Sequence, residues 1–588
     1  MNEIVPTCKQ RLLTGGTLTL TSATALLLPG AAESAVAALL PELRQTTALP
    51  LPVNSASGSP AITVTVAATG GAAGGYTLAI GETVQVVGAD AAGAFYGLQH
   101  LLKLLRRAAD GRTVARQEVI DAPQVAVRGM MIDAGRRYWQ PDTLRALIRE
   151  LAWWHGNRLQ LHLTEWNGFR VRLDDPRFAD LATDPAYSAA EIRELIAYAR
   201  SLHVEVVPEL DLPAHATAII DKRPQLRFDD ADGGAVLNDG SCFTGSLTRS
   251  WTVDITRPQN REWLRELVAA FATELDPVAV HLGADEWRSD ADMAGCTALS
   301  GYAYSLDPTY TATDALVYVV DELAEVVRAQ GRRVEIWNWW ERSSGGDFRR
   351  WPDRRTVITA WPHDPARVAW FSQAGYRVIA SPSSTHYVTP RTFPGNRPDV
   401  NYVAADPEWL YRHWLPGADR ANGYQLCLWS DWAEEQPDTY FLPFARRPLQ
   451  AMLDGCWGGP RLSSLDEFAA AADSLTPDGT APRDRLVGRG PRMTLDTPTQ
   501  LTRLRYRVPA AGQAATIAGR WPDDVHAALD AAIGTVFTGV TPDGQRTELT
   551  RLDSQPQPGW QQIALTSPQT FTQLACDGPL DVDWYGKC

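Results

Sequence analysis

Short runs of apolar residues recur along the middle of the chain, and many are followed by a longer stretch in which apolar residues repeat every three to four positions. A short continuous apolar run is typical of a buried parallel strand, and the longer repeat is typical of an amphipathic helix. The runs occupy residues 125–133, 159–164, 204–210, 278–282, 334–337, 356–361, 377–380 and 424–429. Strands that alternate with helices in this way predict a closed (β/α)8 TIM barrel, an α/β fold.

The stretches between these runs carry helix signals. Pro141 stands at an early helical position of the stretch 141–154, and Ser188-Ala-Ala-Glu191 is a capping box. An open, doubly wound sheet would alternate in the same way, but it carries a glycine-rich phosphate loop after its first strand. We find no such loop in the sequence, so the pattern favours the barrel, which we place at residues 123–480.

A different pattern precedes the barrel. Alternating apolar and polar positions at 61–66, 75–80 and 83–87 predict strands. The stretch 93–105 has apolar residues at helical spacing. Together they predict a small α+β domain over residues 41–122.

Strand-like segments also follow the barrel. They lie at 504–508, 535–540 and 561–565, among turn signals rich in proline and glycine. We interpret residues 481–588 as a small β-rich module. Its sequence offers no motif that points to a function.

Residues 1–40 resemble an export signal. A basic segment, Lys9-Gln-Arg11, precedes an apolar stretch at 12–28 and small residues at 31–37. We therefore expect a leader here and a protein that is secreted or held in the cell envelope. Thr and Gly dilute the apolar stretch, which leaves a cytoplasmic protein as the alternative. No other stretch of the sequence has the length of a membrane span.

The chain has seven cysteines, an odd number. Two pairs could close disulfides in an oxidising compartment: Cys242 with Cys296, and Cys576 with Cys588. Cys427 and Cys456 lie in apolar stretches, where a buried free thiol explains them at least as well. The sequence leaves the oligomeric state open.

Composition narrows the range of partners. The formal net charge is −14 and we see no block of Lys or Arg, so neither nucleic acid nor an anionic membrane is an expected partner. A neutral substrate would not be repelled. The 21 tryptophans are many for this length, and flat aromatic faces are what sugar rings pack against.

Residues that can bind or react follow the predicted strands. They are Arg136, Arg137, His162, Glu165, Asp211, His215, Asp285, Glu286, Trp337, Trp361, Tyr387, Trp429 and Asp431. Because the chemistry of a TIM barrel takes place at the carboxyl ends of its strands, we expect these side chains to gather at one site. We see no His, Cys and carboxylate cluster with the spacing of metal ligands in the sequence, and predict neither a metal nor another cofactor.

Residues 281–287, which read His-Leu-Gly-Ala-Asp-Glu-Trp, are the most informative stretch. Neighbouring side chains of a regular strand face opposite ways, so Asp285 and Glu286 can reach one site only if the strand breaks at its tip. Gly283 and Ala284 leave room for that bend. In an apolar, Trp-lined pocket the pKa values of two carboxylates are pushed apart, which separates an acid from an anion. The alternative is a solvated acidic loop.

Several motifs, in the family's order, resemble the glycoside hydrolase family 20 β-N-acetylhexosaminidases over most of residues 60–470. The family's His-x-Gly-Gly-Asp-Glu is similar to 281–286, and its Pro-Glu-Ile-Asp-Met-Pro-Gly-His is similar to 208–215. Its Asp-x-x-Arg looks like 133–136, and its Trp-Ser-Glu looks like 429–431.

The resemblance implies a retaining glycoside hydrolase that removes β-linked N-acetylhexosamine from the non-reducing ends of an oligosaccharide or glycoconjugate. The substrate's own 2-acetamido oxygen would attack the anomeric carbon and form an oxazolinium intermediate, an exception to two-carboxylate chemistry. Glu286 would protonate the leaving oxygen and then deprotonate the incoming water. Asp285 would accept a hydrogen bond from the acetamido N–H. We expect Asp285 to raise the pKa of Glu286 and keep Glu286 protonated near neutral pH.

The resemblance also implies substrate-binding residues. Arg136 would donate to hydroxyls of the terminal sugar, and His215, linked to Glu165, would hydrogen-bond near the acid. Asp431 would take the place of a longer Glu. Three tryptophans would enclose the acetamido methyl group and the sugar face: Trp337, Trp361 and Trp429. Tyr387 would hydrogen-bond the acetamido oxygen.

Three departures from the family concern sugar specificity. The family's Tyr-x-Asp reads Tyr387-Val-Thr389, Asp431 replaces a Glu, and Glu165 replaces an Asp. They leave open a lacto-N-biosidase-like enzyme that releases a disaccharide, or an enzyme that acts on β-linked glucosamine polymers. The remaining alternative is a catalytically silent carbohydrate-binding barrel.

Overall fold

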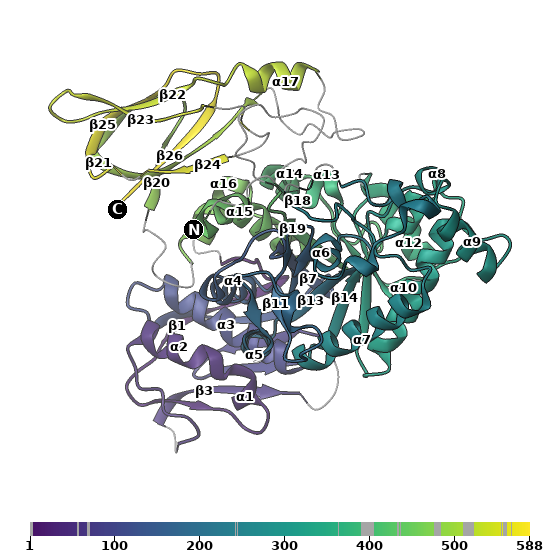
Figure 1. The fold of residues 1–588 in the computed structure, drawn as a ribbon. Coiled ribbons are helices and arrows are strands. Elements are labelled where there is room, and N and C mark those ends of the chain that lie inside the picture. Colours follow the sequence, from purple (N-terminus) through teal and green to yellow (C-terminus); the bar gives the residue numbers. More distant parts are fainter. Residues whose placement is uncertain are drawn as a thin grey trace.

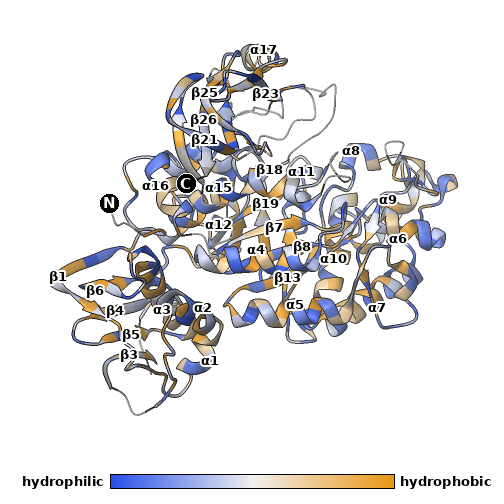
Figure 2. Cartoon of the chain, turned by 90° about the vertical axis from the view of Figure 1, so that its left-hand side faces the viewer, coloured by the Kyte–Doolittle hydropathy of each residue, from blue (hydrophilic) through white to orange (hydrophobic). Residues whose placement is uncertain are grey.

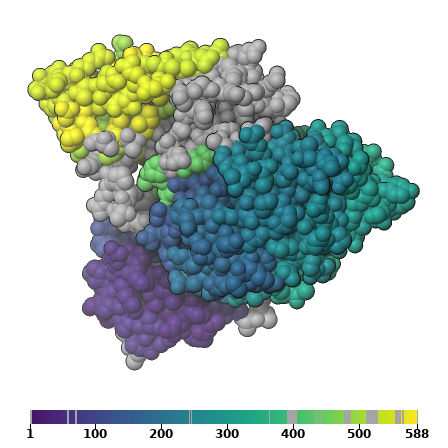
Figure 3. Space-filling model, in the orientation of Figure 1, coloured from purple at the N-terminus to yellow at the C-terminus, as the bar shows by residue number. Residues whose placement is uncertain are grey.

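The computed structural model describes most of the chain. The described residues are 4–55, 58–67, 71–240, 243, 245–362, 364–389, 405–431, 434, 437–475, 484–509, 523–553, 556, 561–565 and 567–587. They form an N-terminal domain, a central barrel and a C-terminal module, which occupy separate parts of the surface in the space-filling view (Figure 3).

The centre of the molecule is a closed barrel of parallel strands, which confirms the predicted fold (Figure 1). The strands follow chain order around it: β7 (Val127–Asp133), β8 (Arg158–His162), β13 (Glu205–Leu212), β14 (Ala279–Gly283), β15 (Arg333–Trp337), β16 (Val357–Ala360), β17 (Val378–Ala380) and β19 (Gly423–Leu428). Pairing of β19 with β7, Cys427 opposite Met131, closes the ring. Short strands lie outside it: β9 (Thr164–Glu165), β10 (Gly168–Phe169), β11 (Val171–Arg172), β12 (Tyr187–Ser188) and β18 (Tyr387–Val388).

Helices cover the outside of the barrel. The longer ones are α4 (Pro141–Trp153), α5 (Ala189–Ser201), α7 (Pro258–Leu275), α9 (Thr297–Leu306), α10 (Ala312–Arg328), α15 (Asp438–Trp457) and α16 (Leu465–Asp473). The shorter ones are α6 (Thr217–Lys222), α8 (Asp290–Met293), α11 (Trp339–Ser343), α12 (Val368–Gln373), α13 (Ser383–His386) and α14 (Pro407–Arg412). All residues of β8 and β19 are buried, including polar ones such as Arg158 and Gln425. The hydropathy colouring shows apolar segments among the barrel strands (Figure 2). The predicted capping box is present, with Ser188 as the N-cap of α5.

The N-terminal domain is a six-stranded sheet with helix α3 (Ala91–Arg107) packed against it, an α+β unit as predicted. The spatial order of the strands is β1 (Gln10–Thr19), β6 (Thr113–Asp121), β4 (Tyr76–Ile80), β5 (Val84–Gly88), β3 (Gly58–Val66) and β2 (Thr24–Leu27). Two short helices, α1 (Ala32–Val36) and α2 (Leu40–Thr47), lie against α3.

The structure corrects the interpretation of residues 1–40 as a leader separate from this domain. Residues 10–19 form the edge strand β1, paired with β6, and residues 24–27 form β2 at the opposite edge. Leu18 and Leu26 of the apolar stretch are buried in the core of the domain. An apolar stretch of this length suits an export signal and a half-buried sheet strand equally well, and only its packing distinguishes them.

The C-terminal module is β-rich, as predicted. Its strands are β20 (Asp484–Arg489), β26 (Asp581–Lys587), β21 (Arg492–Arg507), β25 (Thr570–Cys576), β22 (Val536–Val540) and β23 (Arg546–Arg551) in spatial order, with β24 (Gln561–Ala564) paired to β21. Helix α17 (Asp523–Asp530) follows β21 in the chain. The module has its own apolar core, which includes Phe537 and Trp584. An ion pair of 2.8 Å joins Arg489 to Asp466 of α16 in the preceding part of the chain.

The structure describes five of the seven cysteines. Among them Cys296 and Cys576 are free thiols, and their predicted partners, Cys242 and Cys588, lie outside the described residues, so both pairings stay predictions. Cys427 and Cys456 are buried free thiols, as the apolar sequence around them indicated. Among the described helices, none combines the length and the apolar composition needed to cross a bilayer.

Candidate active site

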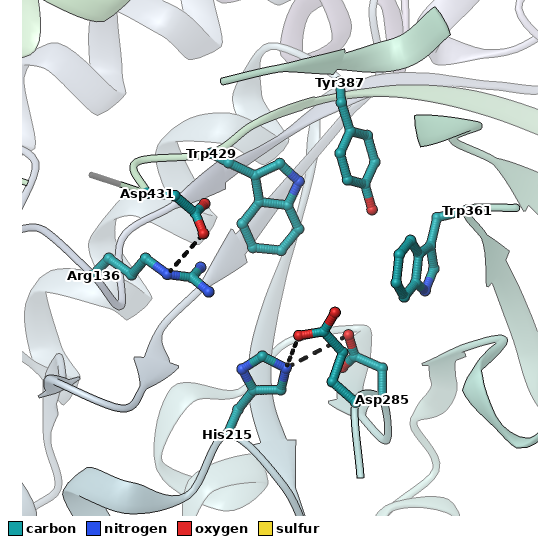
Figure 4. Close-up of a pocket in the computed structure, with 8 residues that line it drawn as sticks. Arg136, His215, Asp285, Trp361, Tyr387, Trp429 and Asp431 are labelled. Atoms are coloured by element: carbon teal, nitrogen blue, oxygen red, sulfur yellow. Dashed lines mark ion pairs between the residues drawn. The ribbon is translucent and has the colours of Figure 1, made fainter. Parts of the chain in front are cut away.

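One pocket opens at the carboxyl ends of the barrel strands and encloses about 370 Å³ of space free of protein atoms, including its open mouth. Its lining residues are Arg136, His215, Asp285, Glu286, Trp361, Tyr387, Trp429 and Asp431. The sequence analysis named all of them. Of the other residues that the sequence analysis placed at strand ends, Glu165 and Trp337 lie behind this lining and contact it. His162 and Asp211 are buried, and Arg137 pairs with Asp438 outside the lining. Figure 4 shows the three aromatic side chains opposite His215 and Asp285, with Arg136 and Asp431 to one side.

The backbone leaves strand geometry at the tip of β14. Gly283, Ala284 and Glu286 have φ angles of +64°, +66° and +51°, in the left-handed region. A Cβ on Gly283 would lie 1.8 Å from Asp211 Oδ1, so only glycine fits there. The bend predicted from the sequence is therefore present, and it turns both Asp285 and Glu286 into the pocket instead of a solvated loop.

His215 connects this carboxylate pair to Glu165 on the next layer inward. Its Nδ1 lies 2.5 Å from Glu165 Oε1, and its Nε2 lies 3.4 Å from Glu286 Oε2 and 3.7 Å from Asp285 Oδ2. Burial by itself lowers the pKa of His215, but the carboxylates around it, first of all Glu165, raise that pKa well above its usual value. Burial acts to raise the pKa of Glu165, yet Arg136 and His215 hold it well below its usual range. The pair is therefore an imidazolium beside a carboxylate.

The two pocket carboxylates have pKa values pushed apart, but in the sense opposite to the expected one. Burial raises the pKa of Asp285 to about 6, against the effect of His215 and with a further contribution from Glu286. For Glu286, burial also acts upward, but the hydrogen bond and charge of His215 lower its pKa overall. The expected rise in the pKa of Glu286 is therefore not found. The reason is that the imidazolium lies nearer to Glu286 than to Asp285.

Asp211 is a further member of the site, to which the sequence analysis gave no role. It is fully buried, and its Oδ1 accepts a hydrogen bond of 3.0 Å from the backbone N–H of Ala284. Burial and the neighbouring charge of Asp285 raise its pKa well above the usual range, so Asp211 is a neutral carboxylic acid beneath Asp285. Its place two residues after Glu209 on β13 was the available signal.

Aromatic side chains form the wall opposite the carboxylates. The rings of Trp361 and Tyr387 are stacked, with centroids 6.3 Å apart, and Tyr387 lies 5.8 Å from Trp429. The buried indole N–H groups of Trp361 and Trp429 have no hydrogen-bond partner among the described residues. Trp337, 1% exposed, packs behind this wall and donates from Nε1 to Glu209 Oε1 at 2.7 Å. The wall suits an apolar group that also brings acceptor oxygens.

Arg136 and Asp431 line the side of the pocket next to Trp429. Arg136 places its guanidinium against three carboxylates: Asp133 at 3.0 Å, Glu165 at 2.7 Å and Asp431 at 3.5 Å. Although burial opposes it, these charges raise the pKa of Arg136 well above its usual value. The guanidinium also lies 5.4 Å from the ring of Trp429. A fixed cation and a partly exposed carboxylate can bind vicinal hydroxyl groups.

The barrel and its pocket match a known sequence family. The profile of the glycosyl hydrolase family 20 catalytic domain matches residues 126–451. The chain belongs to glycoside hydrolase family 20. The profile of domain 2 of the same family matches residues 1–122, and thus includes the strands β1 and β2. As a member of family 20, the protein is a glycosidase that acts on a carbohydrate substrate.

Relatives of this family 20 chain are moderately similar over much of their length. A β-hexosaminidase of Vibrio furnissii is 25% identical over 386 residues, which are 59% of this chain and 59% of that protein. A β-N-acetylhexosaminidase of Cellulomonas fimi is 25% identical over 432 residues, 68% of this chain and 78% of that protein. The chain thus matches less than two thirds of the length of the first relative and more than two thirds of the length of the second.

Solved family 20 structures share the fold. An exo β-N-acetylglucosaminidase of Vibrio harveyi in complex with N-acetylglucosamine aligns with a TM-score of 0.65 at 20% identity, over 80% of this chain and 75% of that one. The β-N-acetylhexosaminidase of Streptomyces coelicolor A3(2) aligns with a TM-score of 0.62 at 21% identity, over 80% of this chain and 94% of that one.

Two buried groups below the family 20 pocket have the residue types of metal ligands. One consists of His162, Glu209 and Asp211, and the other of Asp211, His215 and Asp285. Ion pairs within the groups account for these residues, since His162 Nδ1 lies 3.0 Å from Glu209 and His215 Nε2 lies 3.7 Å from Asp285. We assign no metal to either group. The sequence could not show these groups because their members come from different strands.

Proposed function

We propose that this family 20 chain is an exo-acting β-N-acetylhexosaminidase that works by retaining, substrate-assisted hydrolysis. The observation that carries the proposal is that Asp285 and Glu286 approach the same nitrogen of His215, at 3.7 and 3.4 Å. They therefore lie on one side of the pocket. A retaining enzyme with a protein nucleophile places its two carboxylates on opposite faces of the sugar. The nucleophile then has to come from the substrate, and a 2-acetamido group supplies one.

In the proposed reaction, the proton transfers are assigned to Glu286 and the binding of the acetamido group to Asp285. The acetamido oxygen forms a bond to the anomeric carbon while the bond from that carbon to the leaving oxygen breaks, and Glu286 transfers its proton to the leaving oxygen. Asp285 accepts the acetamido N–H and offsets the positive charge of the oxazolinium ring. A water molecule then forms a bond to the anomeric carbon while the bond from that carbon to the acetamido oxygen breaks, and the water transfers a proton to Glu286. Asp285 Oδ1 is buried without a hydrogen-bond partner among the described residues, so it is available to that N–H.

Substrate binding would also move a proton. Before binding, the proton of the pair belongs to Asp285, because the pKa of Asp285 is raised to about 6 and that of Glu286 is lowered. An acetamido N–H needs an anionic acceptor, so its arrival favours the ionised form of Asp285. The sugar also takes the 37% exposed side chain of Glu286 out of water, which raises the pKa of Glu286. Both effects transfer the proton to the residue that uses it.

The remaining lining residues fit the recognition of one terminal sugar. Arg136 and Asp431 would bind its hydroxyl groups, and Tyr387 would donate to the acetamido oxygen. Trp361 and Trp429 would enclose the methyl group and the sugar face. The relatives named β-N-acetylhexosaminidase support the same substrate class.

A lacto-N-biosidase-like enzyme, which releases a disaccharide, is the second candidate. The observation in its favour is Thr389, whose buried Oγ1 has no hydrogen-bond partner among the described residues, at the position of the family's aspartate. Asp431 is one methylene shorter than the family's glutamate. Thr389 therefore offers no carboxylate to the hydroxyl groups of the terminal sugar, and the carboxylate of Asp431 extends less far toward them. Both changes leave more room beyond the sugar.

A panel of chromogenic glycosides tests these assignments. We expect turnover of the β-N-acetylglucosaminide or β-N-acetylgalactosaminide, and no turnover of the β-glucoside, which lacks the acetamido nucleophile. Exclusive turnover of the lacto-N-bioside would select the second candidate. Equal turnover of the β-glucoside would exclude substrate assistance.

A further inference from the structure

A buried carboxylate lies directly behind the aromatic wall. Glu209 of β13 is fully buried, and its Oε1 accepts the hydrogen bond from the Trp337 indole at 2.7 Å. These residues are 128 positions apart in the chain. The mechanism proposed above uses neither group as a proton donor or nucleophile, so this contact needs another explanation.

The other contacts of Glu209 hold it in one place as an anion. Its Oε2 accepts a hydrogen bond of 2.7 Å from Gln160 Nε2 and lies 3.0 Å from His162 Nδ1, and its Oε1 lies 3.4 Å from His281 Nδ1. Although burial acts to raise its pKa, His162 and His281 hold that pKa well below the usual range. A carboxylate fixed by several neighbours is a rigid acceptor for the indole N–H.

Trp337 packs behind the wall formed by Trp361, Tyr387 and Trp429, and we call these four rings the aromatic box. Its ring packs in one cluster with Trp361 and Tyr387, and its centroid lies 6.2 Å from that of Trp429. A flat indole among other flat rings can occupy a site in two flipped orientations, and close packing alone discriminates poorly between them. The buried N–H of Trp337 selects one of the two orientations, because only that orientation directs the N–H at Glu209 and the other leaves it without a hydrogen bond.

We propose that Glu209 is a positioning residue that locks Trp337 and thereby limits the acyl group on the substrate's 2-amino nitrogen to two carbons. This inference rests on the proposed function, because the acyl group in question is the acetamido group that the pocket would receive. The locked ring closes the end of the box, so a longer acyl chain meets the indole. With the ring released, the box accepts the extra methylene.

The experiment compares hydrolysis of two aryl β-glucosaminides, one N-acetylated and one N-propionylated. The readout is the ratio of their kcat/KM values. The variants are Glu209→Leu, Glu209→Gln, Trp337→Phe and the double variant Glu209→Leu/Trp337→Phe. The matched control is Glu335→Gln, because Glu335 is an equally buried carboxylate of the barrel interior that bonds to Arg158 at 2.6 Å.

We expect the wild type to have a higher kcat/KM for the acetyl substrate than for the propionyl substrate. Glu209→Leu should lower this acetyl-to-propionyl ratio about tenfold. Trp337→Phe, which keeps a ring but removes the N–H, should lower the ratio to a similar extent, and the double variant should lower it no further. Glu209→Gln, which retains an acceptor oxygen, should lie between wild type and Glu209→Leu. Glu335→Gln should leave the ratio unchanged even if it lowers the melting temperature.

The outcomes separate this inference from the function on which it rests. If the wild type hydrolyses the acetyl substrate, but Glu209→Leu and Trp337→Phe have the same acetyl-to-propionyl ratio of kcat/KM as the wild type, Glu209 has only a structural role and the inference is wrong. If Glu209→Leu does not fold, the ratios of Trp337→Phe and Glu209→Gln decide. If the wild type hydrolyses neither substrate, the proposed function itself fails.

Discussion

His215 and Glu286 form an ion pair of 3.4 Å between Nε2 and Oε2 at the carboxylate side of the pocket. The imidazolium lowers the pKa of Glu286, while burial raises the pKa of its neighbour Asp285 to about 6. These opposite shifts have consequences for the pH dependence of the reaction.

The first prediction concerns that pH dependence. The reaction needs one proton on the Asp285–Glu286 pair, and the pair loses it as the pH rises through about 6, the pKa to which Asp285 is raised. At a pH below the lowered pKa of Glu286 both groups are protonated, and Asp285 can no longer accept the acetamido N–H. We expect a bell-shaped profile of kcat/KM with its maximum below about pH 6 and a tenfold fall per pH unit above it. A profile that is flat from pH 6 to pH 8 would contradict this assignment.

Replacing Glu286 by Gln should reduce kcat about 10²- to 10⁴-fold, because the leaving oxygen loses its proton donor. The loss should be smaller for a dinitrophenyl leaving group, which needs little protonation, than for a methylumbelliferyl group. Single-turnover kinetics on both substrates measure the difference. The exposed Glu325→Gln serves as the control and should leave both rates unchanged. An equal loss on both substrates would argue against general-acid catalysis by Glu286.

Arg136→Met tests the side of the pocket that Arg136 and Asp431 line. It removes the partner of Asp133, Glu165 and Asp431, so we expect KM to rise strongly and the free energy of unfolding to fall by about 3–5 kcal/mol. Arg137→Met is the matched control, because Arg137 pairs with Asp438 at 2.8 Å and does not line the pocket. Steady-state kinetics and chemical denaturation measure the two effects. A similar rise of KM in both variants would mean that Arg136 does not contact the substrate.

Gly283→Ala should damage both stability and activity. The added Cβ would lie 1.8 Å from Asp211 Oδ1, in a backbone with φ of +64°, so the tip of β14 must move. We expect a loss of about 2 kcal/mol or more, and a fall of kcat of about 10²-fold as Asp285 and Glu286 shift. Gly295→Ala, where a Cβ meets no atom within 4 Å, is the control for both measurements. Retention of full activity by Gly283→Ala would show that the bend is not required.

Deleting residues 1–28 should unfold the N-terminal domain, because the segment supplies both edge strands of its sheet. The deletion also removes several leucines that are buried in its core, each worth about 1.5–3 kcal/mol: Leu18, Leu20, Leu26 and Leu28. Circular dichroism and limited proteolysis of the truncated protein measure the result. A truncated protein with an unchanged melting temperature would instead restore the leader interpretation.

Much of the site could be read from the sequence because of how a parallel barrel is built. Each strand of such a barrel ends on the same rim, so residues at or soon after the ends of apolar runs, such as Arg136 and Trp429, must meet there. The bend at Gly283 was equally local, since it depends on small residues between a strand and two carboxylates. These inferences need only the order of elements along the chain and the period of their side chains.

Other properties depended on distances between residues that are far apart in the chain. The lowered pKa of Glu286 comes from the approach of His215, the raised pKa of Asp211 from burial beside Asp285, and the anchoring of Trp337 from Glu209 on another strand. Periodicity says which face a side chain takes, but not which charge lies 3 Å away or how much water is excluded. For the same reason, packing alone decided that residues 10–19 and 24–27 form strands of a sheet and that the pKa values of Asp285 and Glu286 shift in opposite directions.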